Sequence, residues 1–350
     1  MNLEAASCAL QAERSGTTMQ TYGQTSLAVL TPLLKRYDVA CSLEEFHQTI
    51  NVVFHDMEAE VYDENHQDMW LSLPRQFELL TSDVLPLAPD RELRALDIGC
   101  GTGLSSELLL RTGLGARVRY LHLLDTSPRM LERSARRHAG IEMQTTEGLT
   151  SDIAQAGTFD LILTCSVLHH IPDLEGFAAE IRRLQRPGGF FLHLQDPNAD
   201  SAGRSERQRR CEIYQRYCQS RIPNGLTRSL TRPASALWRR LTGRQEKTYL
   251  DRVNDELIRR GIVRRAMDPP DIWAVTDIHV GSGDGISVTN LAGYLPGYRL
   301  ISKRSYGFFS ELASSLPEDL RGQENALIDA GSQDGCYVAA AWQLNGYAGA

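Results

Sequence analysis

The chain has 350 residues, a net charge of −7 and 42% hydrophobic residues, which is typical of a globular enzyme with one large domain or two small ones. It has no apolar run of about 18 residues and no basic N-terminal segment followed by an apolar one. We therefore expect a cytoplasmic protein that does not bind membranes. The seven cysteines are scattered without a C-x-x-C pair, which predicts reduced thiols and no structural zinc site.

The helical pattern of residues 1–80 predicts an N-terminal lid. Ser42 and Glu45 form a capping-box signature at the start of an amphipathic run. The apolar side chains of this run recur at helical spacing, at Phe46, Ile50, Val53, Phe54 and Met57.

From about residue 91, short β-rich runs alternate with amphipathic helical segments. Alternation of this kind, with mostly apolar strands, predicts a doubly wound, mostly parallel sheet with helices on both faces. We expect an α/β core at 81–199, a basic helical cap at 200–290, and C-terminal strands at 291–350 that complete the sheet. The predicted strands are residues 94–99, 118–125, 141–146, 159–166, 189–197, 298–308 and 336–344.

The predicted cap contains a strongly basic segment. Residues 201–265 include 17 Lys and Arg against 6 Asp and Glu, and all but one of these cations are arginines. Arginines can bind carboxylates or phosphates bidentately, so an anionic or carrier-protein-tethered acceptor is one interpretation. Internal pairing with the acidic remainder is the other. Nucleic acid ranks third, because the whole chain is acidic and no stacking platform is evident.

The stretch ALDIGCGTG (95–103) ends a predicted strand in a glycine-rich turn. Glycines let a backbone approach a ligand closely, and the following helix offers free N–H donors. Asp125 ends the next strand, where a carboxylate can accept both hydroxyls of a ribose. A nicotinamide dehydrogenase would share these features, but its fingerprint is GxGxxG, whereas this chain has GxGxG with Asp97 ahead of it.

The DxGxGxG spacing resembles motif I of the class I methyltransferases, which bind S-adenosylmethionine (SAM). Three further motifs follow in the family's order: Asp125, Phe159-Asp160 with CSVLHHIPD (165–173) after it, and Pro187-Gly-Gly189 before the fifth strand. The match covers about residues 60–197, and the family's seven-stranded sheet would include the two last predicted strands. These motifs specify fold and cofactor, but say little about the methyl acceptor.

The resemblance implies where SAM binds. The glycine turn would face its amino-acid end, Asp125 its ribose, and backbone at Cys165 its methionine end. The region after the third strand offers several alternative contacts to adenine, none of them preferred. The expected cofactor-binding residues are Asp97, Gly99, Cys100, Gly101, Thr102, Gly103, Asp125, Thr126, Met130, Glu147, Gly148, Leu149 and Cys165.

The implied activity is methyl transfer from SAM to a small-molecule acceptor in specialised metabolism. Such an in-line displacement depends on alignment and needs a base only when the acceptor must lose a proton. Attack on other carbons next to the sulfonium gives the alternatives: aminocarboxypropyl transfer, or cyclisation of SAM to azetidine-2-carboxylate with release of methylthioadenosine. A SAM-binding regulatory protein is the non-enzymatic alternative.

Four residues are candidates for catalysis. His169 and His170 follow the fourth strand, and we expect adjacent residues to point differently, so that only one, preferably His170, faces the acceptor. Both would otherwise shape the pocket without transferring a proton. Asp196 ends the fifth strand and either faces the acceptor or caps a turn. Tyr62, with Asp63 and Trp70, resembles the YD…W lid of small-molecule methyltransferases, although a tyrosine packed on its own helix explains it equally well.

The remaining histidines do not predict a metal site. Asp277 and His279 are expected on one face of a strand, but a third ligand is not evident, so no metal is predicted. His122 and His193 lie within predicted strands and are interpreted as buried sheet residues.

Overall fold

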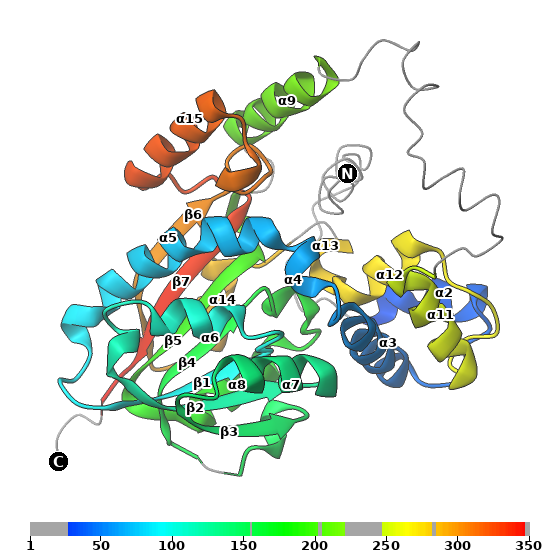
Figure 1. The fold of residues 1–350 in the computed structure, drawn as a ribbon, viewed down its shortest axis with the longest axis horizontal. Coiled ribbons are helices and arrows are strands. Elements are labelled where there is room, and N and C mark those ends of the chain that lie inside the picture. Colours follow the sequence, from blue (N-terminus) through cyan, green and yellow to red (C-terminus); the bar gives the residue numbers. More distant parts are fainter. Residues whose placement is uncertain (1–26, 155, 202–204, 221–246, 282–284, 347–350) are drawn as a thin grey trace.

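The computed structural model describes residues 27–154, 156–201, 205–220, 247–281 and 285–346 (Figure 1). Seven strands form one sheet in the order β3-β2-β1-β4-β5-β7-β6. Strands β1 to β5 are parallel, and β7 lies antiparallel between β5 and β6. The predicted fold class is confirmed. The strands are β1 (Leu93–Ile98), β2 (Val118–Asp125), β3 (Glu142–Glu147), β4 (Phe159–Cys165), β5 (Gln185–Pro197), β6 (Tyr298–Tyr306) and β7 (Tyr337–Leu344).

The fifth strand begins earlier than predicted. The Pro-Gly-Gly segment was expected to form a turn before the strand, but β5 already starts at Gln185. Gln185 pairs with Phe159 of β4, and its side-chain Nε2 donates to the Phe159 carbonyl oxygen at 3.0 Å. The register shifts just after this pair, so the segment is a bulged strand start instead of a separate turn.

Helices cover both faces of the sheet. One face packs on α5 (Gln67–Val84) and α6 (Leu104–Leu110), whose apolar side chains share a core with β1, β2, β4 and β5. The other face packs on α8 (Leu174–Leu184) and α14 (Val288–Tyr294). Two more helices, α7 (Pro128–Arg137) and α15 (Glu318–Asp329), lie against β2 and β3 and against β6, respectively. The helix α5 thus belongs to the sheet core by its packing, although most of it falls within the predicted lid.

A third apolar core joins helices from two distant parts of the chain. Phe46 and Ile50 of α3 (Leu43–Glu58) are buried in one cluster with Val253 and Leu257 of α11 (Tyr249–Arg259). We call the helices of this core the cap, which thus combines part of the predicted N-terminal lid with part of the predicted cap. Helix α3 contacts α7, and α13 contacts the turn after β4, so the cap lies beside the carboxyl ends of the strands. Its other members are α2 (Thr31–Arg36), α12 (Pro269–Thr276) and α13 (Ile278–Gly281).

The prediction of a strand around VTDIHVG was wrong. Pro269 occupies the first position of α12, where its fixed φ favours a helix start, and the helix continues to Thr276. Asp277 follows as the C-cap, and a further helical turn, α13, holds His279. Asp277 and His279 therefore do not share a strand face. Instead, Nε2 of His279 lies 2.7 Å from the Ile171 carbonyl oxygen.

Several of the described arginines of the basic segment contact groups of the protein itself. In α9 (Ser205–Ser220), Arg210 pairs with Asp334, and Arg207 donates to the Asn198 carbonyl oxygen at 3.1 Å. Arg252 of α11 donates to Glu60 at 2.6 Å. These contacts favour internal pairing over binding of an anion. The rest of the segment, residues 221–246, lies outside the described residues.

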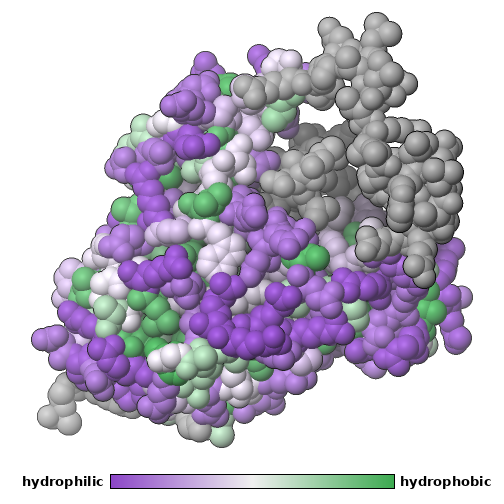
Figure 2. Space-filling view, viewed as in Figure 1, coloured by the Kyte–Doolittle hydropathy of each residue, from purple (hydrophilic) through white to green (hydrophobic). Residues whose placement is uncertain are grey.

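The face of the molecule seen in Figure 2 is mainly hydrophilic, with small scattered apolar areas. Among the helices that the structure describes, none is long and apolar enough to span a membrane.

Candidate cofactor and acceptor site

The turn after β1 is built from glycines for two separate reasons. Gly99 and Gly101 have φ values of 63° and 51°, a left-handed conformation that other residues rarely adopt. A Cβ on Gly99 would lie 2.6 Å from Cγ2 of Val167, so this glycine lets the turn pack against the segment after β4. A Cβ on Gly101 would meet no atom within 4 Å. The backbone at Gly101 therefore faces a space that a ligand can enter.

Asp125 is fixed beside this turn by two backbone donors. Its Oδ2 accepts from the Gly101 N–H and its Oδ1 from the Ser127 N–H, both at 2.8 Å. Burial raises the pKa of this carboxyl, and the same two donors oppose the shift. Each carboxylate oxygen can accept more than one hydrogen bond, so the group can also bind the hydroxyls of a ribose.

Asp97 is a buried carboxylate with one unsatisfied oxygen. Its Oδ2 accepts from the hydroxyls of Ser105, at 2.6 Å, and Ser106. Its Oδ1 is buried and has no hydrogen-bond partner among the described residues. Burial raises the pKa of Asp97 to about 6. Because an unsatisfied buried carboxylate oxygen is costly, this atom suits a ligand with a donor or cationic group, such as the ammonium and sulfonium of SAM.

The Tyr-Asp…Trp segment lies against the glycine turn. Asp63 of α4 (Tyr62–Asn65) accepts from the Thr102 hydroxyl at 2.5 Å and from Arg137 Nη2 at 2.6 Å. The Arg137 guanidinium lies 4.5 Å from the ring centre of Trp70. The Tyr62 ring packs on His66, with centroids 4.4 Å apart. Asp63, which the sequence indicated only as part of the lid motif, thus fixes this segment to the glycine turn.

The other predicted cofactor residues surround the same edge of the sheet. Met130 is buried in the first turn of α7, and the Gly148 N–H donates to the Asp125 carbonyl oxygen at 3.0 Å. Leu149 is exposed, whereas Cys165 at the end of β4 is buried, which raises the pKa of its thiol well above the ordinary value. Contacts of these residues with a cofactor stay predictions. We call the glycine turn, Asp97 and Asp125 the cradle.

His169 and Asp196 form a buried pair next to the cradle. His169 lies in the helical turn after β4, and its Nδ1 is 2.9 Å from Asp196 Oδ1. Burial alone would raise the pKa of Asp196, but the hydrogen bond from His169 and the neighbouring His193 outweigh it and lower the pKa. Because Asp196 is ionised, Nδ1 of His169 carries the proton. His193, like His122, is buried in the sheet as predicted.

A local distortion of two strands brings this pair together. Gln195 and Ser166 have left-handed φ values of 63° and 60°, which are uncommon for residues other than glycine. The register of β5 and β7 shifts between His193 and Asp196, which marks a bulge. The Gln195 N–H donates to the Tyr306 hydroxyl at 2.8 Å. The bulge places Asp196 beside His169, and strained backbone of this kind is often found at functional sites. Whether Asp196 also faces the acceptor stays a prediction.

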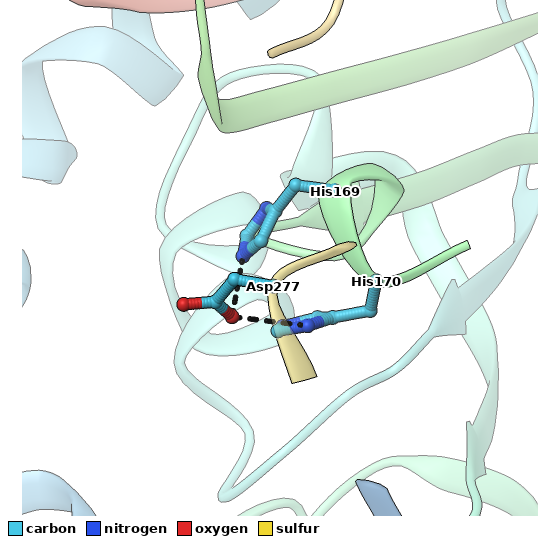
Figure 3. A group of neighbouring side chains, drawn as sticks. All are labelled: His169, His170 and Asp277. Atoms are coloured by element: carbon cyan, nitrogen blue, oxygen red, sulfur yellow. Dashed lines mark ion pairs between the residues drawn. The ribbon is translucent and has the colours of Figure 1, made fainter. Parts of the chain in front are cut away.

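Both histidines face Asp277 (Figure 3). The Asp277 Oδ1 atom lies 3.8 Å from Nε2 of His169 and 3.4 Å from Nδ1 of His170. The two rings are side by side, with centroids 4.0 Å apart. The expectation that adjacent histidines point in different directions was therefore wrong, because the helical turn at 168–170 brings their rings together. Burial, followed by repulsion from His169 and His55, holds the pKa of His170 well below its ordinary value.

Helix α3 and the junction of α4 and α5 contribute residues that the sequence did not predict. The His55 ring lies 5.2 Å from that of His170, and its Nδ1 is 3.9 Å from Oε2 of the buried Glu58. Nε2 of His66 is 3.4 Å from Glu58 Oε1. His55 and Glu58 lie three positions apart just before the lid motif, and this spacing was the sequence signal that could have indicated them. We call His55, His169, His170, Asp196 and Asp277 the histidine cluster.

Two surface cavities lined by described residues lie elsewhere. One of about 300 Å³ lies between β6 and α15, and one of about 280 Å³ lies at the opposite, amino-terminal edge of the sheet. Neither is lined by cradle or cluster residues, so we assign them no role.

The central part of the chain has a clear family match. Residues 96–191, which include the cradle and both adjacent histidines, match the family described as "Methyltransferase domain". These residues are similar to a methyltransferase domain, as the DxGxGxG motif predicted. The unsatisfied Asp97 oxygen, the open face of Gly101 and the fixed Asp125 carboxylate fit SAM, the cofactor that the sequence predicts for this domain.

Similar proteins include curated enzymes named ubiquinone biosynthesis O-methyltransferase. The one from Methylocella silvestris is 44% identical over 111 residues, which cover 30% of this chain and 40% of the relative. The one from Mesorhizobium japonicum is 37% identical over 106 residues, covering 30% and 41%. The chain thus spans about two fifths of the length of the curated relatives it matches.

Two solved structures align loosely with most of the chain. A SAM-dependent methyltransferase from Mesorhizobium loti is 14% identical, with 75% of this chain and 96% of that chain covered and a TM-score of 0.37. The N-methyltransferase NodS from Bradyrhizobium japonicum, solved with S-adenosylhomocysteine, is 11% identical, with coverage of 75% and 84% and a TM-score of 0.36.

Proposed function

We propose that the chain transfers a methyl group from SAM, bound in the cradle, to a small-molecule acceptor beside the histidine cluster. The observation that carries the proposal is the contact between the two regions. Val167, two residues before His169, packs against Gly99 of the cradle so closely that no side chain fits between them. A cofactor against the glycine turn would therefore lie next to the histidines.

Each region would have a separate task. Asp125 and the glycine turn would hold and orient the cofactor, Asp97 would favour its cationic end, and Asp63 would keep the lid segment over the turn. The bound SAM supplies an activated methyl group. Because in-line displacement depends on alignment and on exclusion of water, the cap beside the strand ends has a direct role in the reaction.

The histidine cluster favours a hydroxyl oxygen as the atom that accepts the methyl group. A hydroxyl must lose its proton before or during methyl transfer, and the cluster offers imidazole nitrogens and carboxylates for that purpose. The curated relatives are named as O-methyltransferases, which supports the same choice. A role in specialised metabolism and an anionic or carrier-tethered acceptor stay predictions from the sequence.

The test is the identity of the adenosyl product. The protein is incubated with SAM alone and with fractionated metabolite extracts, and the products are separated by mass. Acceptor-dependent formation of S-adenosylhomocysteine supports methyl transfer. Formation of methylthioadenosine would contradict it and indicate aminocarboxypropyl transfer or SAM cyclisation. Binding of SAM with neither product would indicate a regulatory protein.

A further inference from the structure

We propose that His169, His170 and Asp277 bind a divalent transition-metal ion. The three side chains come from two segments more than 100 residues apart and converge beside the carboxyl end of β4 (Figure 3). One potential ligand atom from each residue lies within 4.8 Å of those of the other two. Metal binding at this place does not depend on the proposed function.

The distances within the group suit a shared ion better than direct hydrogen bonds. Asp277 Oδ1 lies 3.8 Å from His169 Nε2 and 3.4 Å from His170 Nδ1. Hydrogen bonds between nitrogen and oxygen are usually about 2.7 to 3.2 Å long. An ion bonded at about 2.0 to 2.2 Å to each ligand sets the ligand atoms roughly 3 Å apart. Side-chain movements of about an ångström would therefore complete the site.

The His169 ring is oriented by a second group. Asp196 lies 2.9 Å from Nδ1 of His169, so the other nitrogen, Nε2, would bind the ion. Nδ1 of His170 lies 2.8 Å from the Thr276 carbonyl oxygen and would exchange that hydrogen bond for a bond to the ion. Metal-binding histidines usually donate one ring N–H to a carboxylate or carbonyl oxygen, which fixes the ring and raises the basicity of the other nitrogen. The bulge at Gln195 serves this arrangement, because it places Asp196 beneath His169.

The ligand types indicate the class of metal. Two imidazoles and one carboxylate suit first-row transition ions such as Zn²⁺, Fe²⁺ or Mn²⁺, whereas Mg²⁺ and Ca²⁺ prefer oxygen ligands only. Three protein ligands leave coordination positions open for another molecule. The Asp277 side chain is 36% exposed, so these positions can be reached from outside. An acceptor oxygen bound there would lie near the cradle, a role that rests on the proposed function.

Zinc binding tests the site directly. The full, tag-free chain is stripped with a chelator, titrated with Zn²⁺ by calorimetry and analysed for bound metal by mass spectrometry. We expect one ion per chain, and at least tenfold weaker binding in each of His169→Ala, His170→Ala and Asp277→Asn. Asp196→Asn should weaken binding by about 10- to 100-fold, because it removes the partner that orients His169. Asp90→Asn, at a fully exposed carboxylate, is the matched control and should change nothing.

Two outcomes would overturn the proposal. One is no stoichiometric Zn²⁺ binding by the parent chain, and the other is unchanged affinity in the three ligand variants. Thermal melting and SAM titration of every variant show that it is folded. A chain that binds SAM without Zn²⁺ contradicts the metal site alone, whereas one that binds Zn²⁺ without SAM contradicts the proposed function.

Discussion

The cradle and the histidine cluster lie side by side but are assembled in different ways. The cradle comes from two strand–helix turns, and backbone N–H groups hold its key carboxylate, as Gly101 does for Asp125. The cluster gathers side chains from α3, the turn after β4, the end of β5 and the C-cap of α12, so residues from His55 to Asp277 meet only in the folded chain. The cradle thus forms from two neighbouring turns of the chain, whereas the cluster depends on the tertiary structure.

The largest expected effect is on the cradle. Asp125→Ala removes the carboxylate expected to accept two ribose hydroxyls, and hydrogen bonds to charged groups contribute about 1.5 to 3 kcal/mol each. SAM affinity, measured by calorimetry, should fall about 100-fold or more. Asp277→Asn, in the cluster, should leave the SAM affinity within about threefold of that of the parent chain. Equal losses in both variants would contradict the division into two regions.

The two glycines of the turn should differ in a measurable way. Gly99→Ala adds left-handed strain and a collision with Val167, so we expect the free energy of unfolding to fall by about 3 kcal/mol. Gly101→Ala adds the strain alone and should cost about 1 kcal/mol, while its new methyl group enters the ligand space and weakens SAM binding. Urea denaturation and SAM titration give both quantities. Equal stability losses would show that the contact with Val167 is unimportant.

A change within the cluster should affect turnover but not cofactor binding. Asp196→Asn removes the ionised partner that holds the proton on Nδ1 of His169. Turnover at saturating SAM should fall by about 10- to 100-fold, with SAM affinity within threefold of the parent chain. Circular dichroism checks the fold, since Asp196 is buried. Unchanged turnover would reduce the pair to a structural role.

The smallest effect is a pH dependence that belongs to the cradle. Burial raises the pKa of Asp97 to about 6, so this group is ionised at pH 7 and mostly protonated at pH 5. Affinity for the cationic cofactor should therefore fall about tenfold between these pH values. The sign for stability is opposite: protonation favours the folded state, so this contribution is full below about pH 4 and is lost as the pH rises through 6.

Asp97→Asn should flatten both profiles. Persistence of the affinity change in this variant would assign it to another group.

The sequence predicted the glycine turn, Asp125 at the end of the next strand and the seven strands of the sheet, because these features depend on local patterns. The glycine spacing and the acid at the end of the next strand specify this turn without any information on how the rest of the chain packs. It did not predict that Asp277 joins His169 and His170, because that contact depends on how α12 packs on α3 and on where the helix ends. Nor did it predict that Asp196 turns under His169, since a bulge at Gln195 has no glycine to mark it.

Hydrogen exchange with and without S-adenosylhomocysteine tests the central claim most directly. If the cradle binds the cofactor and α4 closes over it, peptides covering residues 97–104, 125–130 and 61–66 should exchange more slowly in the presence of the ligand. Peptides at the opposite edge of the sheet, around Asp160, should be unchanged. Absence of protection at the glycine turn and at Asp125, with ligand in excess, would contradict the account.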